Sequence, residues 1–63
     1  MSDDLDRLLR WEESGALWQV LGPVGETVTV SLRTCDGGEE MDRLISSADD
    51  VLRLCRSRRR SAP

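Results

Sequence analysis

The fold of this chain is decided by Thr27-Val28-Thr29-Val30-Ser31-Leu32-Arg33 and by Cys35-Asp36-Gly37-Gly38-Glu39-Glu40, which follows it after Thr34. Apolar and polar residues alternate in the first part, a period of two that is typical of a half-buried strand. The pattern predicts that Val28, Val30 and Leu32 are buried together, with Thr29 and Ser31 on the opposite face. Asp-Gly-Gly then supplies residues that accept the positive φ of a tight turn. We therefore expect a strand over residues 26–35 and a turn that leads into the next element.

The residues before this strand predict a helix and a first strand. Ser2 is a good N-cap, and leucines follow it at helical spacing up to Gly15, which can take the left-handed conformation that ends a helix. Residues 16–21 predict a strand with Trp18 on its buried face, and Gly22-Pro23-Val24-Gly25 predicts a turn.

Residues 39–57 allow two interpretations. One long helix would explain the spacing of the apolar residues Met41, Ile45, Ala48, Leu52 and Cys55. The alternative is a third strand over residues 39–45 followed by a helix. Ser46 and Ser47 favour this break, because each has an aspartate three residues further on, as in a capping box. A strand after the Asp-Gly-Gly turn also completes a hairpin, so we prefer the broken interpretation.

The predicted fold class is α+β: an N-terminal helix, a three-stranded antiparallel meander and a C-terminal helix. Residues 1–57 form a single small domain, and residues 58–63 form a disordered arginine-rich tail. We expect both helices to cover the sheet face that carries Trp18, Val28, Val30 and Leu32.

The composition excludes most kinds of catalysis. The 63 residues contain no His, Lys or Tyr, which removes the Ser-His-Asp triad, the Schiff-base lysine and any zinc site with histidine. We expect no enzyme, no cofactor and no metal. Four acids near the turn could attract a hard cation, but they lack the spacing of a calcium loop and are interpreted as a solvated turn: Asp36, Glu39, Glu40 and Asp42.

The N-terminus and the cysteines predict a cytoplasmic protein. The first residues are acidic, unlike a signal peptide, and no apolar run approaches the length that crosses a membrane. Cys35 and Cys55 should both be free thiols, as is usual in the cytosol. Cys55 fits a small core residue, and Cys35 is the more exposed and the better candidate for a reactive thiol.

Charge is distributed unevenly along the chain. Residues 1–52 hold all twelve acids and four arginines, a net charge of −8, whereas residues 53–63 hold five arginines and no acid, a net charge of +5. The alternative function that this suggests is nucleic-acid association through the basic end, which comprises Arg53, Arg56, Arg58, Arg59 and Arg60. The acidic body opposes nucleic acid at long range, so we do not favour it.

Three segments resemble a group of very short uncharacterised proteins from high-GC Gram-positive bacteria. They are Arg10-Trp11-Glu12-Glu13, Trp18-Gln19-Val20-Leu21 and the stretch from Cys35-Asp36-Gly37-Gly38-Glu39-Glu40 to Leu44. The resemblance covers about residues 7–54 and implies a sheet followed by a helix. It implies no function, since no activity is assigned to that group, and the basic end lies outside it.

These observations predict a non-catalytic protein-interaction or regulatory accessory module with an unknown protein partner. Trp11, on a helix flank, is the candidate for an exposed anchor on that partner. Association into a homodimer is another way for so small a domain to gain burial.

Overall fold

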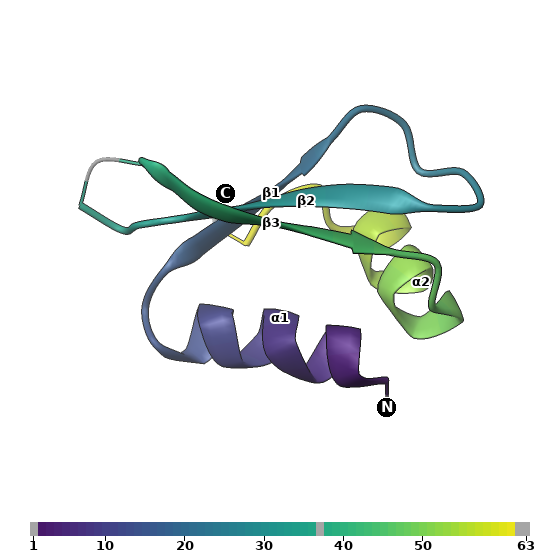
Figure 1. Cartoon of the computed structure of the whole chain (residues 1–63), viewed down its shortest axis with the longest axis horizontal. Coiled ribbons are helices and arrows are strands. Elements are labelled where there is room, and N and C mark those ends of the chain that lie inside the picture. Colours follow the sequence, from purple (N-terminus) through teal and green to yellow (C-terminus); the bar gives the residue numbers. More distant parts are fainter. Residues whose placement is uncertain (1, 37, 62–63) are drawn as a thin grey trace.

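The structure is a computed structural model that describes residues 2–36 and 38–61. Its elements follow the order α1 (Asp3–Glu13), β1 (Leu17–Leu21), β2 (Val28–Arg33), β3 (Glu40–Ser46) and α2 (Asp49–Ser57). The strands form one antiparallel sheet in the order β1-β2-β3. The predicted α+β fold is therefore confirmed, with both helices lying on the same side of the sheet (Figure 1).

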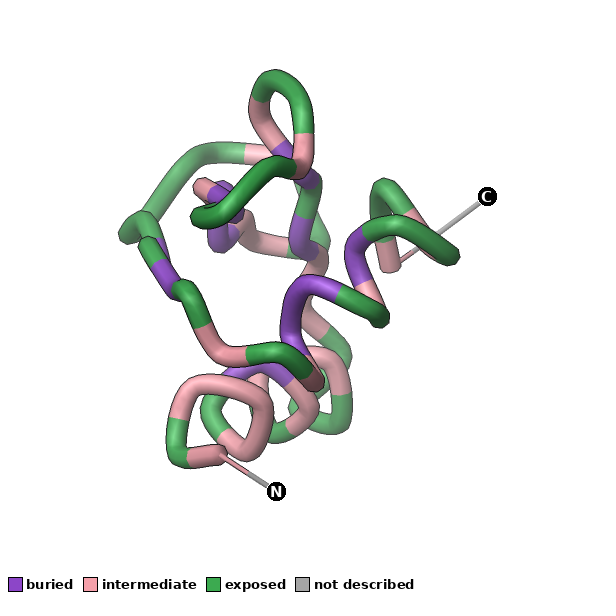
Figure 2. The backbone as a smooth tube through the Cα atoms, turned by 90° about the vertical axis from the view of Figure 1, so that its right-hand side faces the viewer, coloured by how far each residue is buried: buried purple, intermediate pink, exposed green. Residues whose placement is uncertain are grey.

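The sheet register separates two faces. Trp18 lies opposite Leu32, and Val20 lies opposite Val30 on the face toward the helices. Val28, Val30 and Leu32 are each at most 1% exposed, which confirms that they are buried together. Figure 2 marks which residues along the backbone are buried and which are exposed.

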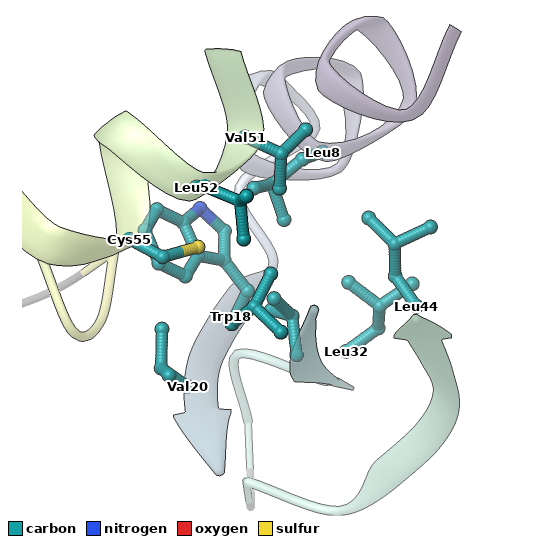
Figure 3. Close-up of a cluster of buried hydrophobic side chains, with 10 residues drawn as sticks. Leu8, Trp18, Val20, Leu32, Leu44, Val51, Leu52 and Cys55 are labelled. Carbon is teal, nitrogen blue, oxygen red and sulfur yellow. The ribbon is translucent and has the colours of Figure 1, made fainter. Parts of the chain in front are cut away.

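The core joins this sheet face to both helices. Leu8 of α1 and Val51, Leu52 and Cys55 of α2 complete the cluster of buried side chains, with Trp18 as its largest member. Figure 3 shows the side chains of α2 meeting the Trp18 indole. The sequence prediction that Trp18 and Cys55 belong to the core is confirmed.

Helix α1 begins and ends as its sequence predicts. The Ser2 hydroxyl accepts a hydrogen bond from the Leu5 amide at 3.1 Å, which satisfies one of the free donors of the first turn. Gly15, just beyond the helix, has a φ of 90°, a conformation that only glycine adopts readily.

The start of α2 differs from the predicted capping box. The N-cap is Ala48, which makes no side-chain bond to the helix. The Ser46 hydroxyl instead donates to Asp4 Oδ2 of α1 at 2.6 Å and accepts from the Ala48 amide at 3.2 Å. Because Ser46 ends β3 with its side chain toward the helices, a tertiary partner replaces the local one.

A second contact ties the N-termini of the two helices together. Asp50 of α2 accepts hydrogen bonds from the amide and the hydroxyl of Ser2, each at 2.8 Å. These bonds hold the pKa of Asp50 below its usual value. The bond from the backbone N–H has the larger effect, and the bond from the hydroxyl has the next largest. The ionised carboxylate is therefore the form that stabilises the fold.

This contact predicts a specific response to acid. A carboxyl whose folded-state pKa is lowered contributes stability above its unfolded pKa of about 3.9, and this contribution is lost as the pH falls through the folded value. Asp50→Asn should therefore lower the urea midpoint at pH 7 and weaken the further loss of stability on acidification. Asp49→Asn is the matched control, because Asp49 is exposed in the same helical turn. Equal acid dependence in the two variants would contradict the assignment.

Strand β3 resolves the ambiguity of residues 39–57. It pairs with β2 over its whole length, so the interpretation as one long helix is wrong. The register skips Met41 between Leu32–Asp42 and Arg33–Glu40, which makes Met41 a bulged residue on this edge strand. Met41 is 59% exposed and Ile45 is 68% exposed, so the apolar spacing that suggested a helix does not reflect a single buried face.

The chain after α2, which the sequence predicts to be a disordered tail, lies beside the sheet over residues 58–61. Residues 58–61 turn back along the outer edge of β1, where Arg60 forms an antiparallel bridge with Gln19. The segment contains almost no apolar residue, which is why the sequence predicts disorder. Its contact with β1 is made by backbone hydrogen bonds instead of by burial of apolar side chains. Residues 62 and 63 lie outside the described residues.

Candidate interaction surfaces

Trp11 lies against the core rather than free in solvent. Its indole N–H donates to the carbonyl oxygens of Leu17 at 2.6 Å and of Arg33 at 3.2 Å, and its ring packs against the buried cluster. The remaining exposed part borders an open groove of about 400 Å³ on the surface of α1. The structure thus differs from the expected exposed anchor, and binding of a partner through Trp11 stays a prediction.

The five arginines of the basic end differ in their surroundings. Arg53 and Arg56 are exposed on α2, and Arg60 is exposed at its bridge to β1. Arg59 donates to the Gly22 carbonyl at 2.6 Å. Arg58 is folded onto the body of the protein, so fewer guanidinium groups are free to contact phosphates than the sequence predicts.

Arg58 is held by a carboxylate, an aromatic ring and a carbonyl. Its Nη2 lies 3.0 Å from Glu12 Oε1, and its guanidinium carbon lies 5.4 Å from the centroid of the Trp18 ring. The same Nη2 donates to the carbonyl of Ser61 at 2.9 Å. The arrangement combines a charge-assisted hydrogen bond with a cation–π contact.

Glu12 makes tertiary contacts that sequence reasoning missed. Its Oε1 accepts from Trp18 Nε1 at 3.1 Å as well as from Arg58, so one oxygen links α1, β1 and the C-terminal segment. The available signal was that an acid near the C-terminus of a helix is unfavourable for the helix dipole. A residue in an unfavourable local position often has a tertiary partner.

The face of the sheet away from the helices is uncovered by any element of the described chain. By register, Gln19, Ser31 and Arg43 share this face, and Thr29 lies opposite Ile45 on it. Ser31 is nonetheless fully buried among its neighbours, and its hydroxyl has no hydrogen-bond partner within the described residues. Ile45 is exposed on this face, and the bulged Met41 is exposed on the same strand.

Two of the four acids near the turn, Glu40 and Asp42, are paired with arginines. Arg43 donates a hydrogen bond to Glu40 at 2.7 Å, and this bond lowers the pKa of Glu40. The nearby Ser31 hydroxyl lowers the same pKa by a smaller amount. The Arg43 amide, followed by the Arg7 guanidinium, lowers the pKa of Asp42. Within residues 2–36 and 38–61, no group of three acid, cysteine or histidine side chains could hold a metal ion.

The two cysteines lie in different environments. Cys35 is exposed beside the turn between β2 and β3, and Cys55 is buried in the core, as their positions in the sequence predict. Burial raises the pKa of the Cys55 thiol, which keeps it protonated and unreactive. Cys35 is thus the more accessible thiol.

No family model, curated protein or solved structure matches this chain. Among the helices of the described residues, neither is long and apolar enough to span a membrane. The surfaces described above are therefore the basis for the functional argument.

Proposed function

We propose that this protein is a non-catalytic, cytoplasmic protein-interaction module that contacts its partner through the open sheet face around β3. The observation that carries the proposal is the distribution of apolar surface. Ile45 and Met41 are the exposed large apolar side chains of the described residues, and both lie on one edge strand. The two residues lie four positions apart along β3, and an apolar side chain that is exposed in the free protein can be buried in the core of an interface with a partner.

The geometry of the domain supports this choice of face. Both helices occupy the opposite side of the sheet, so a partner could approach β3 without displacing any part of the folded core (Figure 1). Arg43, two residues before Ile45 on the same strand, forms an ion pair with Glu40. This pair gives the exposed Ile45 side chain polar neighbours, as at the rim of an interface. The separate placement of Cys35 and Cys55 suits a reducing compartment such as the cytoplasm.

A photo-crosslinking experiment tests this assignment. A photoreactive amino acid at position 45 should capture a protein in the source cell, and the same group at position 53 should not, because Arg53 is exposed on the helical side of the domain. Ile45→Thr should reduce the partner's affinity at least about tenfold, the effect of losing one central apolar contact. Threonine keeps the β-branched shape of the strand residue, so the circular dichroism melt should change little. Equal capture from both positions, or unchanged affinity of Ile45→Thr, would refute the proposal.

A further inference from the structure

The C-terminal segment completes the hydrogen bonding of β1 as an added strand would. The Val20 amide donates to the Arg59 carbonyl at 2.6 Å, and the Ser61 amide donates to the Trp18 carbonyl at 2.9 Å. The Ser61 hydroxyl also accepts from the Trp18 amide at 2.9 Å. Residues 58–61 therefore satisfy the edge of β1 with backbone and side-chain groups alike.

The two edges of the sheet are protected in different ways. β3 carries three charged residues and a bulge, features that discourage another strand from pairing with it. β1 has the sequence Leu-Trp-Gln-Val-Leu, with no charge, proline or bulge. This edge depends on the C-terminal segment for its cover, and it is the edge to which an extended peptide could add.

The β1 edge also has a built receptor for one side chain. Glu12 and the Trp18 ring together contact the guanidinium of Arg58, as described above. The Trp18 N–H is bonded to Glu12, so the carboxylate is also oriented by a contact that does not involve Arg58. Strand pairing supplies sequence-independent affinity, and this receptor supplies selectivity for arginine.

We propose that the β1 edge, with Glu12 and Trp18, is a strand-addition site for an extended arginine-bearing segment of another protein, filled within the chain by residues 58–61. Charge complementarity supports a basic occupant, because residues 1–52 hold twelve acids and only four arginines. The site lies at the opposite edge of the sheet from β3. Its test is therefore independent of the test of the proposed function.

Occupation by its own segment makes the site competitive. Because Arg58 directly follows α2, its effective concentration at β1 is of the order of millimolar or more, as for other short connections. A foreign segment must therefore displace residues 58–61, and any change that weakens the internal contact should increase binding from outside. This dependence gives the proposal a measurable consequence.

The test uses the full chain and a fluorescent peptide with the sequence of residues 57–63. In the double variant Arg58→Ala, Ser61→Ala, the internal segment loses its ion pair and its hydroxyl contact. This variant should bind the peptide at least about tenfold more tightly than the wild type in fluorescence anisotropy, because the internal segment that competes for the site loses two of its contacts. Adding Glu12→Gln should weaken the gain, whereas Glu13→Gln, at the exposed neighbouring position, should leave it unchanged.

Peptide controls separate recognition from general charge attraction. A scrambled peptide of the same composition, and one with alanine in the place of Arg58, should each bind more weakly. Equal binding of these peptides, equal effects of the Glu12 and Glu13 substitutions, or no gain in the folded double variant would overturn the proposal.

If circular dichroism shows that the double variant does not fold, the wild-type chain decides the question. Excess unlabelled peptide at millimolar concentration should then shift the NMR signal of the chain's own Ser61 amide, which loses its bond to the Trp18 carbonyl, whereas the Val20 amide finds an equivalent carbonyl in the peptide. A Ser61 signal that stays in place at that concentration would refute the site.

Discussion

Trp18→Ala should remove most of the stability of this protein. Trp18 is the largest fully buried side chain, and it contacts residues from both helices and the sheet (Figure 3). Truncating a buried tryptophan to alanine costs about 3–5 kcal/mol, through lost burial and the cavity left behind. A domain of 63 residues has a stability of roughly 3–9 kcal/mol, so the variant should be largely unfolded or close to it.

Urea denaturation followed by far-ultraviolet circular dichroism measures this loss. Trp18→Phe is the informative companion, because it keeps an aromatic ring in the core but removes the N–H that donates to Glu12. It should lie between the wild type and Trp18→Ala. A midpoint for Trp18→Ala close to that of the wild type would show that the core does not depend on this side chain.

Leu8→Ala should have the second largest effect, and its neighbour provides the control. Leu8 is fully buried against the sheet, whereas Leu9 is only partly buried and lies outside the core cluster. We expect a loss of about 2–5 kcal/mol for Leu8→Ala and about 1 kcal/mol or less for Leu9→Ala. Alanine favours the helix at both positions, so helix propensity cannot cause the difference. The same chemical denaturation compares the two variants, and equal losses would contradict the observed orientation of α1.

The candidate surfaces were harder to predict than the fold, and Trp11 shows why. An indole on a helix flank fits an exposed anchor as well as it fits a core edge, and the choice depends on whether backbone carbonyls lie within reach of its N–H. The carbonyls of Leu17 and Arg33 lie within reach of the Trp11 N–H only because β1 and β2 pair beside the end of α1. Ser46 is a second example. The sequence predicts that it caps α2, but its hydroxyl donates to Asp4 of α1, which is distant in the sequence.

The sequence by itself determined the first helix, the first two strands and the buried face of the sheet, whereas the pairing of β3 with β2 decided between strand and helix after the turn. The alternation around Val30, the N-cap at Ser2 and the glycine at position 15 are local signals, because strand and helix periodicity and positive φ are properties of a few adjacent residues. Only the tertiary structure decided where the segment after α2 lies. Its order rests on the unpaired edge of β1 and on a carboxylate 46 residues away in the chain, Glu12, which accepts from Arg58. No local pattern encodes a partner at that distance, so a segment that looks disordered in sequence adds a third row of hydrogen bonds to the sheet.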